Sequence, residues 1–261
     1  MSSCSLSPQD APWNVYSYRA SLYARFRLDY APELVAKVAT CTGLERDHAV
    51  ADIGAGTGIL TRHFLDRAKL VYCVEPNAAM LHEAEIRLSS HPVFMSVCGS
   101  AEATGLPDRS VHLIVAGMAL DWFQPEMALL EFHRILSPSG WLATFRYRVD
   151  EPLLREMSSY LKGLPKPPKT IRPGTNDPDR YLASGYSKVE HKCSCEETFE
   201  QFMGGASATE GAPSVGSPEY KGFYSAHRRA FLALSVNGKL RTDYTCIATV
   251  GRLRKHGSSM V

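Results

Sequence analysis

The sequence lacks the features that mark membrane, secreted and nucleic-acid-binding proteins. No run of apolar residues approaches the roughly 18 needed to cross a bilayer. The opening residues 1–8 have neither the basic flank nor the apolar stretch of a secretory signal. With 29 Lys and Arg against 27 Asp and Glu, the net charge of +2 provides no excess of basic side chains for a phosphate backbone. We therefore expect a cytoplasmic protein without a membrane or nucleic-acid partner.

Cysteine does not occur in the patterns that bind metal or build a disulfide framework. The seven cysteines are odd in number and scattered along the chain. Only Cys193 and Cys195 lie close together, and their spacing is shorter than the roughly two- to four-residue gap of zinc sites. No matching His or Cys pair follows them. The sequence therefore predicts no metal site, and an odd set of scattered thiols suits a reducing compartment.

The chain does have an ordinary globular composition and a regular alternation of sequence patterns. Hydrophobic residues make up 44% and charged residues 21% of the chain, which suits one large core or two smaller ones. From about residue 31 to 148, short apolar segments typical of buried strands alternate with segments of helical spacing. This alternation predicts an α/β fold with a doubly wound, mainly parallel sheet. We expect strands at 50–53, 69–74, 93–97, 111–116 and 141–147, helices at 31–40, 59–68, 77–88 and 126–136, and a turn at 138–140.

The alternation ends after residue 148. Five prolines between 165 and 178 predict a loop, and the glycine-rich stretch 203–222 is expected to be irregular as well. The remaining segments predict a strand at 186–195, an amphipathic helix at 219–236 and a strand at 240–250. We therefore expect a core with an N-terminal helical segment at 1–150, a cap insertion after the fifth strand at 151–218, and a final helix and strand at 219–261 that complete a seven-stranded sheet.

A glycine-rich turn after the first expected strand is the most informative segment. It reads Asp52-Ile53-Gly54-Ala55-Gly56-Thr57-Gly58. In a parallel sheet, ligands bind at the carboxyl ends of the strands, and glycines let the backbone approach them closely. A phosphate-binding Walker loop requires Lys after its last glycine, where this chain has Ile59. A dinucleotide fingerprint starting at Gly54 requires Gly or Ala at that same position, so Ile59 disfavours it too.

The run from Val50 to Gly58 resembles motif I of the class I methyltransferases that use S-adenosylmethionine. Later segments match that family's further motifs in order and spacing, and together they cover about residues 48–148. The resemblance implies a Rossmann-like methyltransferase sheet. The matching segments are Glu75 after the second strand, Gly99 to Glu102 with Gly105 to Pro107, Ala116 to Phe123 after the fourth strand, and Arg134 to Gly140 before the fifth.

The resemblance also implies which residues hold S-adenosylmethionine. A carboxylate at Glu75 would accept hydrogen bonds from both ribose hydroxyls. Ser100 stands where the family commonly has an acidic residue that binds the adenine amino group. The segment from Tyr23 to Pro32 resembles that of trans-aconitate methyltransferase-like small-molecule enzymes, in which it folds over the cofactor. The complete expected set is Tyr23, Arg27, Asp52, Gly54, Ala55, Gly56, Gly58, Glu75, Asn77, Met80, Ser100 and Ala101.

The expected reaction is SN2 methyl transfer to a small molecule, at oxygen or nitrogen, with Asp121, Trp122 and His191 as catalytic residues. Asp121 stands where many relatives have His before this Trp, and it is either a base or substrate residue or a cap for the next helix. Trp122 either lines the acceptor pocket or packs in the core. His191, in the expected cap, would serve as base for a phenol or ammonium acceptor.

Three alternative functions compete with this expectation. An RNA or other macromolecule methyltransferase is one alternative, although base methylation at exocyclic nitrogen commonly uses Asn/Asp-Pro-Pro-aromatic where this chain has Ala116 to Ala119. A non-catalytic protein that retains the fold is a second, and an NAD(P) oxidoreductase is a third, disfavoured by Ile59. We expect a small-molecule substrate and a monomer or homodimer.

Overall fold

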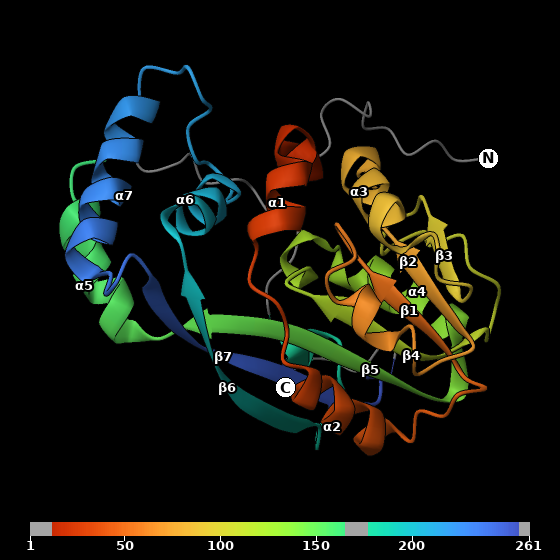
Figure 1. The fold of residues 1–261 in the computed structure, drawn as a ribbon. Coiled ribbons are helices and arrows are strands. Elements are labelled where there is room, and N and C mark those ends of the chain that lie inside the picture. Colours follow the sequence, from red (N-terminus) through yellow and green to blue (C-terminus); the bar gives the residue numbers. More distant parts are fainter. Residues whose placement is uncertain (1–11, 165–176, 256–261) are drawn as a thin grey trace.

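The computed structural model describes residues 12–164 and 177–255, whose strands form one seven-stranded sheet (Figure 1). The strand order is β3-β2-β1-β4-β5-β7-β6, and β7 runs antiparallel to both of its neighbours while the other neighbouring pairs are parallel. This arrangement confirms the predicted α/β, doubly wound sheet. The strands are β1 (Ala49–Ile53), β2 (Leu70–Val74), β3 (Phe94–Val97), β4 (Val111–Gly117), β5 (Leu136–Val149), β6 (Ser187–Glu197) and β7 (Leu240–Gly251).

Helices cover both faces of the central strands, which is why β1 is buried along its whole length. Successive side chains of a strand point to opposite faces. Ala51 and Ile53 accordingly pack in a core with Phe132 of α4 (Pro125–Ile135), whereas Val50 packs in a second core with α2 (Pro32–Thr42). The predicted near-continuous apolar runs are therefore those of strands covered on two sides.

Local sequence signals set where several helices begin. Pro32 and Pro125 stand at the start of their helices, where a missing backbone N–H costs least. Asn77 caps α3 (Ala78–Leu88), because its side-chain oxygen accepts hydrogen bonds from the backbone N–H groups of Ala79 and Met80. These starts agree with the sequence predictions to within a residue or two.

The predicted helix at 59–68 is wrong. The chain forms a run of turns there, with only a short 3-10 helix, η2 (Thr61–Phe64). The positive φ of Gly56 and Gly58 keeps the chain in tight turns as it leaves β1, and the Thr61 hydroxyl donates a hydrogen bond back to the carboxylate of Asp52 in that strand. The helical spacing reflects burial instead, because Leu60, Phe64 and Leu65 are all buried.

Two further expectations differ from the structure. The turn expected at 138–140 lies inside β5, opposite a register shift between Val111 and Leu113. The stretch 203–222 is only partly irregular, because α6 (Phe199–Ser207) extends into it. Gly204 within α6 lets the ring of Phe26 approach so closely that a Cβ there would overlap it. The proline-rich loop lies mostly outside the described residues.

Three helices gather beyond the β6–β7 end of the sheet (Figure 1). They are α5 (Glu151–Leu161), α6 and α7 (Tyr220–Leu234), and they share an apolar cluster that includes Phe202 and Phe231. The N-terminal elements η1 (Pro12–Arg19) and α1 (Ala20–Phe26) lie between this group and α3, and α1 contacts both α6 and α3. The strand β6 of the predicted cap segment belongs to the sheet itself, whereas the division at 150 and 218 stays a prediction.

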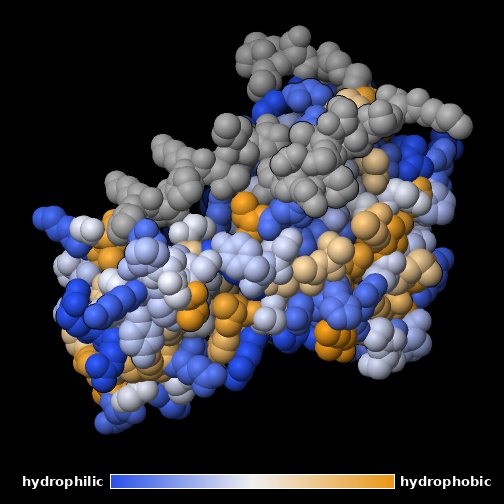
Figure 2. Space-filling view, turned by 90° about the horizontal axis from the view of Figure 1, so that it is seen from above, coloured by the Kyte–Doolittle hydropathy of each residue, from blue (hydrophilic) through white to orange (hydrophobic). Residues whose placement is uncertain are grey.

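The outer surface is mixed in character. Seen from above in Figure 2, hydrophobic side chains stand in small groups among hydrophilic ones on the visible part of this face. None of the helices within 12–164 and 177–255 is long and apolar enough to cross a membrane.

Candidate functional site

A cleft of about 670 Å³, including the space at its mouth, opens at the carboxyl ends of β1, β2 and β4. Strands β1 and β4 are the neighbours from which the chain winds outward in opposite directions, and ligands bind at this switch point in open α/β sheets. The cleft is lined by Trp13, Tyr16, Tyr23, Gly54, Gly56, Glu75, Pro76, Met80, Ser100, Ala101, Glu102, Gly117, Met118, Ala119, Trp122 and Phe123.

The glycine turn forms the floor of the cleft. Gly54 has a φ of +68°, and a Cβ there would lie 2.8 Å from the Cβ of Ala119. Gly56, at φ +57°, would bring a Cβ to 3.3 Å from Met80 Cε. Glycine is required at both positions because no other residue combines that backbone with that space. Gly58 serves a different purpose: it packs against Ala84 and Leu88 of α3 and does not line the cleft.

Glu75 follows β2 and fastens the glycine turn to the end of the sheet. Its Oε2 accepts the backbone N–H of Gly56 at 2.8 Å, and its Oε1 accepts that of Asn77 at 3.0 Å. Burial raises the pKa of this carboxyl to about 7, and the two backbone hydrogen bonds only partly oppose that shift. Each oxygen retains a lone pair, so the carboxylate can still accept two hydrogen bonds from a ligand diol.

Asp52, in β1, lies beside a second, smaller pocket of about 380 Å³. Its Oδ2 accepts the Thr61 hydroxyl at 2.7 Å, whereas its Oδ1 is buried without a hydrogen-bond partner among the described residues. Burial raises the pKa of Asp52 to about 7, and the nearby carboxyl of Glu75 adds to the shift. An unsatisfied buried carboxylate oxygen is costly, so this atom suits a cationic or hydrogen-bond-donating ligand group.

Arg27 and Tyr23 border the same small pocket. The guanidinium lies over the rings of Tyr23 and Tyr147, 5.0 and 5.4 Å from the ring centres. The Arg27 Nε is buried and has no hydrogen-bond partner among the described residues. A carboxylate-bearing ligand would supply the missing acceptor, because guanidinium and carboxylate pair through two parallel hydrogen bonds.

Asn77 contributes by holding the N-terminal segment over the cleft. Its Nδ2 donates to the Trp13 carbonyl and to the Ser17 hydroxyl, each at 3.0 Å, while its Oδ1 caps α3. The Asn77 side chain does not itself line the cleft. The resulting aromatic wall includes Tyr16, whose ring packs edge-on against Tyr23 and against Trp122.

The structure brings most of the predicted cofactor residues together. Met80, Ser100 and Ala101 line the main cleft, and Ala55 lines the smaller pocket. Sequence reasoning missed Trp13, Tyr16 and Met118, which also line the cleft. The concentration of aromatic residues between 13 and 30 was the available signal for the first two. Met118 has a φ of +54° at the end of β4, and no sequence pattern marks that strained position.

The predicted catalytic residues are not all in one place. Trp122 lines the cleft, and Asp121 precedes it in η3 (Leu120–Trp122) but is not among the lining residues. The capping role considered for Asp121 is wrong, because Gln124 occupies the N-cap of α4. His191 lies in β6, where its Nε2 is 3.7 Å from a carboxylate oxygen of Glu33 in α2, and it lines neither pocket. The sequence places His191 in a cap, and the register with β7 instead fixes it in the sheet.

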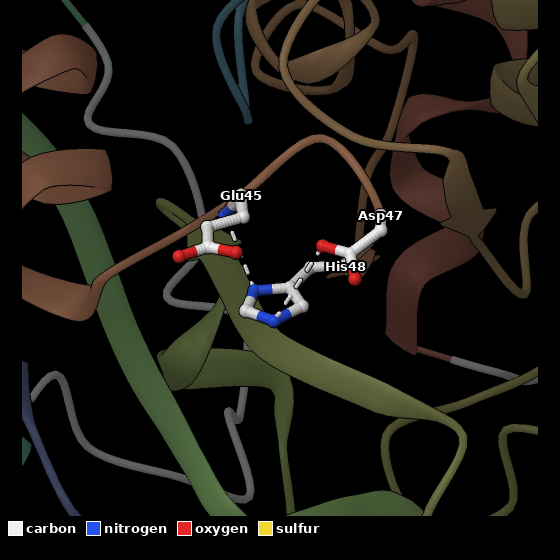
Figure 3. A group of neighbouring side chains, drawn as sticks. All are labelled: Glu45, Asp47 and His48. Atoms are coloured by element: carbon white, nitrogen blue, oxygen red, sulfur yellow. Dashed lines mark hydrogen bonds and ion pairs between the residues drawn. The ribbon is translucent and has the colours of Figure 1, made fainter.

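One group of side chains in the described residues has metal-ligand chemistry (Figure 3). Glu45, Asp47 and His48 stand on the loop before β1, and both acidic residues are exposed. The Nδ1 of His48 already accepts the backbone N–H of Glu45 at 3.2 Å. Exposed acidic groups are common without a metal, and His48 Nδ1 is already engaged, so this group gives no reason to assign a metal.

Comparison with known proteins agrees with this geometry. Residues 51–144 match the family model described as a methyltransferase domain. An uncharacterised methyltransferase of Mycobacterium tuberculosis is 31% identical over 141 residues, which cover 53% of this chain and 55% of that protein. An uncharacterised methyltransferase of Schizosaccharomyces pombe is 32% identical over 122 residues, covering 46% and 47%. The matched part of the chain therefore spans about half the length of these curated relatives.

Solved structures extend the similarity of fold to nearly the whole chain. A candidate type II methyltransferase from Anaeromyxobacter dehalogenans superposes with a TM-score of 0.64 at 22% identity, covering 87% of this chain and 98% of the other. The cyclase SpnF superposes with a TM-score of 0.54 at 15% identity, covering 95% and 97%. The same fold thus occurs both in a protein named as a methyltransferase and in one named as a cyclase, so the chemistry is inferred from the site and not from the fold. The matched family model, the strand order and the glycine–Glu75 turn agree that residues 51–144 of this chain resemble a methyltransferase domain.

Proposed function

We propose that this protein transfers the methyl group of S-adenosylmethionine to a small-molecule acceptor, at an oxygen or nitrogen atom. The observation that carries the proposal is the chemistry around the two adjoining pockets. Glu75 has lone pairs for a ribose diol, and Asp52 Oδ1 and Arg27 Nε are buried atoms that have no hydrogen-bond partner among the described residues. The two pockets share Tyr23 and the glycine turn, so one elongated ligand can occupy both.

Each end of the cofactor has a matching group in this arrangement. Glu75 would accept both ribose hydroxyls, and the Ser100–Ala101 wall would face the adenine. Asp52 Oδ1 would accept from the methionine ammonium, and Arg27 would bind the methionine carboxylate. S-adenosylmethionine supplies an activated methyl group on a positively charged sulfur. Bringing that cation beside Asp52 and Glu75 would also lower the pKa of both carboxyls, because opposite charges favour the ionised form.

The protein's part in the transfer is alignment and the exclusion of water. The reaction needs the acceptor atom held in line with the bond that breaks, and positioning of this kind contributes much of an enzyme's rate. Aromatic residues of the N-terminal segment and Trp122 would shield the methyl group from water. Asp121 remains our proposed base, whereas the position of His191 supports no role in the transfer.

A small-molecule acceptor is supported by the net charge of +2 and by the enclosure of the site under the N-terminal segment. A nucleic-acid substrate would need a basic surface, which that charge does not provide. We infer that the protein works in the cytoplasm as a monomer or homodimer.

The test is transfer of a tritium-labelled methyl group from S-adenosylmethionine to a metabolite extract, with identification of the labelled product by mass spectrometry. Labelling of a small molecule that is lost in Glu75→Gln supports the proposal. Labelling of RNA or protein in its place would replace the proposed acceptor class. Binding of the cofactor without any labelling would indicate a non-catalytic protein with this fold.

A further inference from the structure

A third cavity, of about 1320 Å³ including its open side, lies beneath α5, α6 and α7. Arg27, Leu28 and Tyr147 line both this cavity and the small pocket beside Asp52. These three residues, the neck, therefore mark where the cavity adjoins the proposed position of the methionine half of the cofactor. A molecule in the cavity could present one end at that neck.

The lining of the cavity is mainly apolar. Its α5 side consists of Leu153, Leu154, Met157 and Leu161, which recur at helical spacing on one face. Leu153 and Met157 pack in part against the cluster of Phe202 and Phe231, but no residue of α5 is buried and Leu154 is 48% exposed, so much of this apolar face stays open to the cavity. From Leu153 to Leu161 the face runs for about 12 Å, at about 1.5 Å per residue. A partly open apolar face of this length suits an elongated apolar ligand.

Besides Arg27 and Tyr147, the polar side chains that line this cavity are those of Glu197, Thr209, Glu210, His227 and Thr242. Glu197 is already engaged, because its Oε2 accepts the Thr242 hydroxyl at 2.6 Å. His227 is 5% exposed, and its Nδ1 lies 2.8 Å from the carbonyl oxygen of Phe223. A carbonyl only accepts, so Nδ1 carries the proton and donates it there, which leaves the lone pair on Nε2. Burial lowers the pKa of His227, so the ring is neutral at neutral pH and Nε2 remains a hydrogen-bond acceptor.

We propose that this cavity is the acceptor site, and that the acceptor is an elongated, mainly apolar molecule with its nucleophilic group at the Arg27–Tyr147 neck and its chain along α5. A hydrogen-bond donor on the body of that molecule would face Nε2 of His227. In the transfer, a lone pair of the acceptor oxygen or nitrogen forms the bond to the methyl carbon. The electron pair of the breaking C–S bond stays on sulfur, and the acceptor's proton goes to a base or to water. This inference rests on the methyl transfer proposed above.

The first test measures transfer to unbranched aliphatic alcohols, amines and carboxylic acids of increasing chain length. We expect kcat/KM to rise about fourfold for each added methylene until the chain fills the cavity, which is the effect of burying one CH2 group. A kcat/KM that does not change with chain length, or that favours short polar acceptors, would overturn the inference while leaving the proposed function intact. Absence of cofactor binding by calorimetry would instead remove the proposed function.

Matched variants locate the effect. Ala206→Trp places a large ring in the cavity, whereas Leu232→Trp adds the same ring at an exposed position on α7. We expect Ala206→Trp to lower kcat/KM at least tenfold for the longest acceptors only, with cofactor affinity unchanged, and Leu232→Trp to have no effect. If Ala206→Trp does not fold, Leu161→Gln replaces it, because that half-exposed residue can lose its apolar surface at little cost to stability. Equal losses for short and long acceptors would overturn the inference.

A binding experiment completes the test. A dansyl-labelled medium-chain fatty acid should bind with a blue-shifted emission, and Ala206→Trp should weaken that binding at least tenfold. His227→Phe should weaken an acceptor with a mid-chain hydroxyl but not its deoxy analogue. Binding of the probe only after removal of residues 165–176 would show that the chain itself covers α5, and this would also overturn the inference.

Discussion

Replacing Glu75 with Gln tests the cofactor site directly, because the change keeps the shape of the side chain and removes its charge. In the structure this carboxylate accepts two backbone N–H groups and retains a lone pair on each oxygen. Hydrogen bonds to a charged group contribute about 1.5–3 kcal/mol, which is the loss of binding free energy expected when the charge of Glu75 is removed. Since about 1.4 kcal/mol is tenfold in affinity, the Kd for S-adenosylmethionine should rise by a factor of roughly 10 to 150.

The pH dependence sharpens this prediction. Glu75 in the folded protein has a pKa of about 7, above the ordinary value of 4.5, so between those values the folded state binds more protons than the unfolded state. Stability of the cofactor-free protein therefore falls as pH rises through this range. Cofactor affinity should move in the opposite direction, because the ionised carboxylate is the better acceptor of ribose hydroxyls. Both slopes should be shallower in Glu75→Gln, with Asp52 supplying what remains.

Calorimetric titration with S-adenosylmethionine, and with its demethylated product, between about pH 5.5 and 8 measures both effects. Glu45→Gln is the control, because that carboxyl is exposed and lies on the loop before β1. Circular dichroism at each pH verifies the fold of every variant. A folded Glu75→Gln protein with unchanged affinity, or with the same pH slope as the control, would refute the assignment of Glu75 to the ribose.

Three other substitutions test separate parts of the site. Gly54→Ala should lower the free energy of unfolding by about 1–3 kcal/mol, because it strains a positive φ and brings Cβ within 2.8 Å of the Ala119 Cβ. Urea denaturation measures the loss. Gly163→Ala is the control that separates backbone strain from crowding, because Gly163 also has a positive φ but no atom within 4 Å of a Cβ there. Asn77→Ala should cost about 1 kcal/mol of stability through the lost cap and should also speed proteolysis near Trp13, which a cap alone would not do. Asp121→Asn should lower turnover and leave cofactor affinity unchanged; an equal loss of both would assign Asp121 a structural role.

The parts of the site that the sequence predicted are those encoded by local chemistry. The glycine turn, Glu75 and the Asn77 cap each depend on residues within a few positions of one another along the chain or at the end of an adjacent strand. Such features follow from backbone geometry and from hydrogen bonding that any fold of this class must satisfy. The sequence alone therefore predicts them.

The remaining parts depend on contacts between distant segments. The positions of Trp13 and Tyr16 are set by hydrogen bonding to Asn77, more than 60 residues away. The apolar spacing at 59–68 predicted a helix because burial and helical periodicity leave the same pattern in a short segment. The sequence places His191 in a cap because no local signal marks the pairing of its strand with β7, which lies some 50 residues further along the chain.

The anchoring of the N-terminal segment by Asn77 has a consequence for where the working unit begins. The segment that matches the methyltransferase family starts at residue 51, yet Trp13, Tyr16, Tyr23 and Arg27 border the pockets from outside it. A fragment trimmed to the matched boundaries would retain the glycine turn and Glu75 but lose one wall of the cleft and the neck to the third cavity. Proteins that share only the matched segment with this chain can therefore be expected to differ from it in how tightly they enclose the cofactor and in which acceptors they admit.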